Sequence, residues 1–220
     1  MASLAEASLL SGLAMQAMRS SRPASGAGHL FSHVWEMEGH GMDSEPPLSH
    51  GFKVGIGTVA SCALWADALE FDPASVDVDQ LVAEAPGAAE IEAKCRSLLI
   101  PRLVNEAVEQ SLAKMVTGDA LRQRLLTIQS RWPEIRSRCA AQLVSPGEAT
   151  ARVRAAGAPH HPTQIGIDLA RLRRTYLQAQ LIRSRYTILD VLAELGMLEQ
   201  LVDKLFEPDG FWSRQPAPNS

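Results

Sequence analysis

Aromatic residues are scarce in this sequence, and an excess of basic residues is lacking. Phe, Trp and Tyr make up 5% of the 220 residues, and no segment alternates polar and apolar residues for long enough to predict a strand. Ala and Leu are abundant instead, and both favour helix. The net charge of −4 at pH 7 does not provide the basic surface that a nucleic-acid-binding protein needs. We therefore expect a helical protein that binds no nucleic acid.

A regular cysteine pattern is lacking as well. Cys62, Cys95 and Cys139 are odd in number and widely spaced, without a CxxC pair, so they predict neither a disulfide framework nor a zinc knuckle. We expect three buried thiols in a cytoplasmic protein. Nowhere are there about 18 uninterrupted apolar residues, so we expect no transmembrane span and no membrane partner.

A 3.6-residue period of apolar positions recurs along the chain and predicts helices. The chain begins inside this pattern, without a cap or lead-in, as a truncated helix would. We predict one all-α domain over residues 1–212 and a disordered tail over 213–220. The helices are expected at 3–20, 28–38, 50–69, after Ser75 or Asp77, at 88–98, from Pro101, at 120–143, from a Ser145–Glu148 capping box, and at 163–184, 187–195 and 197–206.

Four of the six histidines lie close together in the sequence: His29, His33, His40 and His50. His29 and His33 are four residues apart on a predicted helix, so they project from one face and could converge on one metal or one substrate. His50 opens the next predicted helix, where the loop at 39–49 could bring it back toward His29. Histidine pairs at this spacing are also common on surfaces and in cores, so the spacing alone leaves both interpretations open.

The other histidines are expected to have no role in metal binding. His40 lies in a loop rich in Gly, Asp and Glu and is expected to be solvated, while His160 and His161 precede Pro162 and are expected to form a polar loop pair.

The segment from Gly55 to Ala60 matches the dinucleotide-binding fingerprint GxGxxA only loosely. That fingerprint requires a strand before it and an acidic residue roughly 20 positions later, whereas a helix is predicted here. We expect instead that Gly55 and Gly57 let another helix or a ligand approach closely.

Two strings in the sequence carry a resemblance to a known family. They are Ser21-Arg-Pro-Ala-Ser-Gly-Ala-Gly-His-Leu-Phe-Ser-His33 and His50-Gly-Phe-Lys-Val-Gly55. Together they resemble the metal-site segments of sn-glycerol-1-phosphate dehydrogenases, in a superfamily with glycerol dehydrogenases, iron-containing alcohol dehydrogenases and dehydroquinate synthases. The later string Arg183-Ser-Arg-Tyr-Thr-Ile-Leu-Asp190 is similar to the bacterial members. Gly28 and Phe52 depart from the family pattern, which usually has Glu at both places.

The resemblance implies a fold and a set of site residues. The fold is the helical, metal-binding C-terminal domain of a dehydroquinate synthase-like two-domain enzyme, and the N-terminal Rossmann-like domain that binds NAD(H) or NADP(H) has no counterpart in the chain. His29 and His50 would bind a divalent metal, with zinc expected first and nickel or iron as alternatives, and His33 would contact substrate. The family's remaining ligand, an Asp many tens of residues before these motifs, is absent.

The resemblance also implies metal-assisted hydride transfer between dihydroxyacetone phosphate and sn-glycerol 1-phosphate, a reaction of phospholipid metabolism. His33 would also act catalytically, as a proton relay, and Lys53 would either face the substrate phosphate or be an exposed lysine beside the site. This oxidoreductase chain is expected to be inactive or incomplete alone, with a homo-oligomer or a separate nucleotide-binding chain as possible partners. The alternative is a stand-alone, non-catalytic helical binding or regulatory protein that retains the scaffold.

Overall fold

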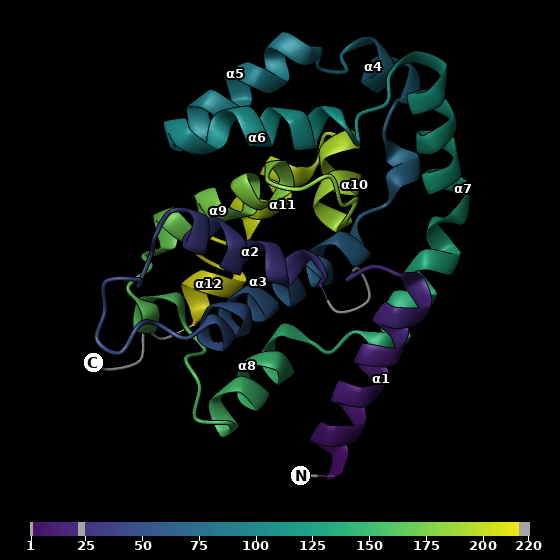
Figure 1. The fold of residues 1–220 in the computed structure, drawn as a ribbon. Helices are drawn as coiled ribbons and strands as arrows, with labels where there is room; N and C mark the ends of the chain where they lie inside the picture. The colour runs from purple at the N-terminus through teal and green to yellow at the C-terminus, as the bar shows by residue number, and fades with distance from the viewer. Residues whose placement is uncertain (1, 22–24, 216–220) are drawn as a thin grey trace.

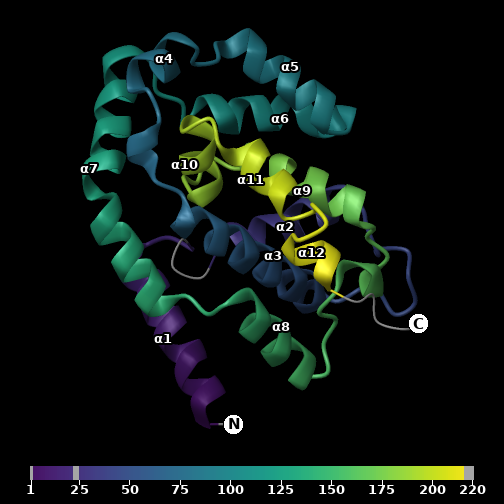
Figure 2. The ribbon, with the colours of Figure 1, turned by 180° about the vertical axis from the view of Figure 1, so that it is seen from behind.

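The computed structural model describes residues 2–21 and 25–215, and within these ranges it contains helices and no strand (Figures 1 and 2). The prediction of an all-helical chain is therefore confirmed. Residues 22–24 of the first family string and 216–220 of the predicted tail lie outside the described residues. The α-helices are α1 (Ala2–Met18), α2 (Ala27–Met37), α3 (His50–Glu70), α4 (Val78–Ala83), α5 (Ala88–Leu98), α6 (Pro101–Leu112), α7 (Gly118–Gln142), α8 (Pro146–Ala155), α9 (Leu169–Leu181), α10 (Ile188–Glu194), α11 (Leu198–Lys204) and α12 (Phe211–Arg214), with short 3₁₀ helices at η2 (Pro73–Ser75) and η3 (Pro162–Ile165).

The centre of the protein is an aromatic cluster that joins α2, α3, α9 and α12. The ring of Tyr176 meets the ring of Phe31 edge to face, with 4.7 Å between their centres. The Tyr176 hydroxyl donates to the carbonyl oxygen of Ala60 at 2.9 Å and accepts from Nε1 of Trp212 at 3.0 Å. Burial raises the pKa of this hydroxyl. Because both polar tips are paired inside the core, these aromatic rings contribute apolar burial without an unsatisfied donor.

Helices α2 and α3 approach each other at two glycines. A methyl group on Gly57 would lie 2.1 Å from the carbonyl oxygen of Gly28, and one on Gly28 would lie 2.8 Å from the carbonyl oxygen of Gly57. A methyl group on Gly55 would meet only ordinary contacts, the nearest at 3.5 Å from Val153. The expected close approach is therefore confirmed for Gly57, while Gly55 is not at the contact. This contact brings the start of α2 against the first turns of α3.

One predicted helix begins later than expected. The sequence predicts helix from 163 onward, but α9 begins at Leu169. Gly166 interrupts the helix because it adopts a left-handed conformation with φ of 73° after the short helix η3. Asp168 then caps α9, since its carboxylate accepts from the backbone N–H of Arg171 at 2.7 Å. Of the two candidate caps for α4, Asp77 is the one that accepts from the helix backbone.

The C-terminal part of the described chain is packed onto the core. Trp212 is buried, and Ser213 and Arg214, which the sequence analysis places in the tail, belong to helix α12. Gly210 permits this turn because a methyl group there would lie 2.3 Å from the carbonyl oxygen of Lys204.

Helix α1 projects beyond the helical body in both views (Figures 1 and 2). Leu9, Leu10 and Leu13 are each about 60–70% exposed. Among the described residues, α3 is long and apolar enough to cross a membrane by length and composition, but half of its most apolar window is buried, as in the core helix of a globular protein. The exposed apolar surface of α1 is therefore the more unusual feature.

The Gly28–Gly57 contact predicts opposite effects for two alanine substitutions on α3. Gly57→Ala places a methyl group against backbone, which cannot move aside cheaply, so we expect a loss of about 2 kcal/mol or more in the free energy of unfolding. Gly55→Ala is the matched control, because it has room and gains helix propensity of up to about 1 kcal/mol. Urea unfolding followed by circular dichroism measures both. Equal stabilities for the two variants would contradict the close contact.

The exposed face of α1 predicts association. Replacing Leu9, Leu10 and Leu13 by Gln keeps residues that favour helix and removes apolar surface. We expect the unsubstituted chain to self-associate in size-exclusion chromatography with light scattering, and the triple variant to shift toward monomer. An unsubstituted chain that is monomeric at all accessible concentrations would contradict this prediction.

Candidate functional site

Three histidines converge where α2 meets the start of α3. The ring centres of His29 and His33 are 4.7 Å apart, those of His29 and His50 are 4.9 Å apart, and those of His33 and His50 are 6.3 Å apart. The loop between α2 and α3 thus returns His50 to His29, as the sequence analysis expects. Imidazoles at these separations can converge on one small ligand, and a pair of them can supply two ligands to a metal ion.

Glu36 is a site residue that the sequence analysis missed. The N–H at Nδ1 of His50 donates to Oε1 of Glu36 at 2.7 Å, and Nδ1 of His33 lies 3.9 Å from Oε2. Glu36 follows His29 by seven residues, so the spacing i, i+4, i+7 along α2 places all three side chains on one helix face. A carboxylate that accepts a hydrogen bond from one imidazole nitrogen orients the ring. Nε2 of His50 then keeps its lone pair and is the nitrogen available to a metal ion.

Lys53 is buried rather than exposed, which corrects the reading of it as an exposed lysine. Its side chain is 1% exposed, and Nζ lies 3.8 Å from Oε1 of Glu36. A buried ammonium needs a nearby anion to offset its desolvation. Lys53 therefore balances the charge of Glu36.

A cavity of about 420 Å³ adjoins the histidines. Two arginines from the turn between α9 and α10 line it together with His29 and His33. The Arg185 guanidinium donates to the carbonyl oxygen of Ser25 and, through Nη2, to Oγ of Ser21 at 3.2 Å. The two arginines are Arg183 and Arg185, and the other lining residues are Met15, Ser21, Ser25 and Leu30. In the sequence, Arg183 and Arg185 stand out only as part of a family string, which assigns them no role.

The environment lowers the pKa of two of the histidines. Burial is the main cause for His29, with the positive charges of His50 and Arg185 acting in the same direction and Glu36 opposing them. Burial also dominates for His33, followed by the charges of His29 and Arg183. A lowered pKa keeps both imidazoles neutral near pH 7, which is the form that binds a metal ion.

The donor set fits part of a metal site. His29 and His50 supply neutral nitrogen donors, and Glu36 orients His50. Within residues 2–21 and 25–215, however, no group of three or more His, Cys, Asp or Glu side chains could hold a metal ion. A catalytic metal usually has three protein ligands. The arrangement is therefore that of a two-histidine half-site, and the assignment of His29 and His50 as ligands stays a prediction.

His40 and His161 differ from the sequence expectations. His40 is held rather than solvated, because Nε2 donates to the carbonyl oxygen of Ile165 at 2.6 Å and Nδ1 accepts from Arg171 at 2.9 Å. His161 lies in a loop, as expected, but is 4% exposed and caps η3.

The cysteines are all free thiols. Cys95 is buried as expected, whereas Cys62 and Cys139 are only half-buried.

The lowered pKa values of His29 and His33 predict a pH dependence of stability. The unfolded chain binds protons near the usual histidine pKa of about 6.5, before the folded site does. Their contribution to stability is therefore present above pH 6.5 and is lost as the pH falls through the lowered values. Histidine-selective NMR titration should show both residues titrating below 6.5, and His33→Gln should flatten the loss of stability at acid pH. Midpoints at or above 6.5 would contradict the burial of these rings.

The chain matches several curated relatives that share one name. It is 30% identical over 197 residues to a glycerol-1-phosphate dehydrogenase (NAD(P)+) of Geobacillus thermodenitrificans, and the match covers 89% of this chain and 39% of that protein. It is 48% identical over 62 residues to the enzyme of the same name from Halalkalibacterium halodurans, covering 28% of this chain and 15% of the relative. A match to the Pyrococcus horikoshii enzyme of that name has 48% identity over 54 residues, covering 24% of this chain and 14% of the relative.

The match to the Geobacillus protein therefore spans about two fifths of that relative's length. No protein-family model matches the chain, and no solved structure matches it with significance. The relatives carry one name, and one of the matches extends over nearly all of this chain. The chain belongs to the glycerol-1-phosphate dehydrogenase family.

Proposed function

We propose that the chain is the metal- and substrate-binding part of an NAD(P)-dependent sn-glycerol-1-phosphate dehydrogenase, and that its helices form the C-terminal domain of the dehydroquinate synthase-like superfamily. The observation that carries this proposal is the convergence of His29, His33 and His50 within 6.3 Å. The relatives' shared name supports the substrate pair, dihydroxyacetone phosphate and sn-glycerol 1-phosphate.

The roles of the residues follow from their environments. His29 and His50 would hold a divalent ion, zinc before nickel or iron, which when bound draws electron density from the substrate carbonyl. Glu36 accepts the hydrogen bond from Nδ1 of His50, so Nε2 would be the atom of that ring that binds the ion. His33, whose lowered pKa keeps it neutral near pH 7, would hydrogen-bond the substrate oxygen or relay a proton to it.

The reaction needs components beyond the described residues. In this proposal a third metal ligand and the nicotinamide site come from another part of the protein or from a separate nucleotide-binding chain in the cytoplasm. A nicotinamide bound there would supply the hydride, and this chain would bind and orient the acceptor. The chain is accordingly expected to be inactive by itself.

The alternative is a non-catalytic helical binding or regulatory protein that retains the scaffold. The observation in its favour is that the described residues contain no three-donor group for a metal ion. The two functions differ in metal binding at His29 and His50, which only the dehydrogenase requires.

Metal titration of the chain tests the half-site directly. We expect Zn²⁺ to bind more weakly than to a complete three-ligand site, and His29→Ala or His50→Ala to lower the affinity by at least about 10-fold. Glu36→Gln should lower it by about 10-fold through loss of the orienting carboxylate. His160→Ala, a half-buried loop histidine away from the site, is the matched control. Isothermal titration calorimetry measures the zinc affinity of the unsubstituted chain and of the four variants. Affinities independent of His29 and His50 would favour the alternative.

Catalysis requires the missing components. The chain alone, loaded with zinc, should not oxidise NADH in the presence of dihydroxyacetone phosphate, because nothing positions the hydride donor. Adding a nucleotide-binding domain of the family as a separate chain should produce turnover that His33→Ala lowers by about 100-fold. Robust turnover by the chain alone, followed as loss of NADH absorbance, would contradict this expectation.

A further inference from the structure

The turn between α9 and α10 places two guanidinium groups at the histidine cavity. Arg183 and Arg185 line this cavity together with His29 and His33. The Arg185 guanidinium donates to the carbonyl oxygen of Ser25 and to Oγ of Ser21, both of which also line the cavity. The cavity is thus lined by two histidines and two arginines.

We propose that Arg183 and Arg185 form an anion subsite that takes the phosphate group of the substrate, which would place the substrate's carbonyl end toward His29 and His33. The assignment of a phosphate ester rests on the proposed function. The guanidinium pair itself rests on the geometry of the cavity, and guanidinium forks match the oxygens of a phosphate dianion.

The charges around the cavity support a bound anion. Glu36, the carboxylate beside the three histidines, is engaged by His50 and lies near Lys53, so it balances positive charge on the histidine side. Arg183 pairs with Glu106 at 3.0 Å, but the Glu106 side chain is half-exposed. Exposed pairs of this kind contribute little, so a phosphate could replace Glu106 at low cost.

Lys53 is a poorer phosphate ligand than the arginines. Its ammonium is buried near Glu36, whereas the two guanidinium groups border the open cavity. Moving Lys53 toward a substrate would leave the Glu36 carboxylate with one fewer positive neighbour. The sequence expectation that Lys53 could serve the phosphate is therefore replaced by this assignment.

A buried ion pair holds the turn that carries both arginines. Nζ of Lys114 lies 2.7 Å from Oδ1 of Asp190, and the two side chains are 8% and 4% exposed. The same ammonium donates to the carbonyl oxygen of Arg183 at 2.9 Å and to that of Gln180. Oδ2 of Asp190 accepts from the backbone N–H of Thr187 at 2.7 Å. The pair therefore ties the end of α9, the turn and the start of α10 together.

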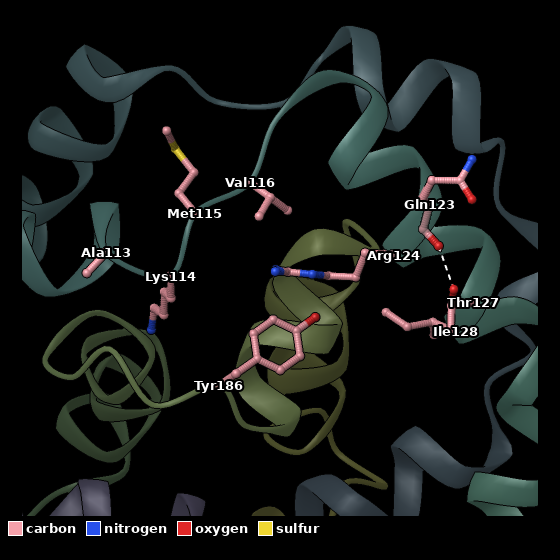
Figure 3. A pocket seen from close by; sticks show the side chains of 9 residues that line it. All are labelled: Ala113, Lys114, Met115, Val116, Gln123, Arg124, Thr127, Ile128 and Tyr186. Carbon is pink, nitrogen blue, oxygen red and sulfur yellow. Dashed lines mark hydrogen bonds between the residues drawn. The ribbon is translucent and has the colours of Figure 1, made fainter.

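Contacts of Tyr186 with α7 and α10 also hold this turn in place. Figure 3 shows Lys114, Arg124 and Tyr186 among the residues that line a second cavity beside this turn. The guanidinium of Arg124 lies 4.8 Å over the Tyr186 ring, and the Tyr186 hydroxyl donates to Glu194 at 2.5 Å. Lys114 and Asp190 are thus positioning residues for Arg183 and Arg185. A guanidinium group whose position is already fixed loses less conformational entropy when it binds an oxyanion.

Binding of inorganic phosphate to the full, metal-free chain tests the subsite apart from catalysis. We expect phosphate to perturb the NMR signals of His29 and His33, and Arg183→Gln or Arg185→Gln to weaken the apparent affinity by about 10-fold or more. Arg174→Gln, an exposed arginine of α9, is the matched control, and glycerol should cause no perturbation. Phosphate binding that is absent, or unchanged in both variants, overturns the proposal.

The outcomes separate this proposal from the proposed function. Zinc binding at His29 and His50 together with arginine-independent phosphate binding would remove the subsite and leave the dehydrogenase assignment. Arginine-dependent phosphate binding without zinc binding would keep the subsite and remove that assignment.

The positioning role of the Lys114–Asp190 ion pair is tested by comparing phosphate and zinc affinities, which a loss of stability alone would not separate. Asp190→Asn should weaken phosphate binding several-fold while zinc affinity stays unchanged, because the turn moves and the α2–α3 contact does not. If Asp190→Asn does not fold, Ser111→Ala is the second variant, because it removes the hydroxyl that donates to the carbonyl oxygen of Leu181 at 3.1 Å. It should likewise weaken phosphate binding and leave zinc affinity unchanged. Equal losses of zinc and phosphate affinity would contradict a positioning role.

Discussion

The close packing of α2 on α3 is the constraint on which the candidate site depends. Gly28 and Gly57 let the two backbones meet where any side chain would collide with a carbonyl group. The position of His29 and His33 relative to His50 follows from this contact, because the two helices contribute the three rings. The aromatic core around Tyr176 then fixes α9 and α12 against the same pair of helices.

The charged side chains near the three histidines form two groups. Glu36 faces His50 and the buried Lys53, whereas Arg183 and Arg185 face the open cavity beside His29 and His33. In the proposed function, the neutral imidazoles would bind a cation and the two arginines would orient an anionic substrate. The proposed metal ligands and the proposed phosphate subsite would thus lie at one cavity.

Much of the helical layout could be predicted from the sequence, because local signals determine it. The apolar period and capping residues such as Asp77 and Ser145 place most helices within two residues of their observed bounds. The late start of α9 was missed because Gly166 adopts a left-handed conformation that the apolar period does not reveal.

The site was predicted only where spacing along one helix or a family string pointed to it. His29, His33 and His50 were found in this way. The i+7 spacing from His29 could also have identified Glu36. Arg183 and the burial of Lys53 depend on contacts between segments far apart in sequence, which no local pattern encodes.

The central claim is that this chain supplies two histidine ligands to one divalent ion. X-ray absorption at the zinc edge of the zinc-loaded chain counts imidazole ligands directly. The account predicts two imidazoles with water or other light ligands completing the shell, and one imidazole in the His50→Ala variant. A zinc shell without imidazole, or one that His50→Ala leaves unchanged, would contradict it.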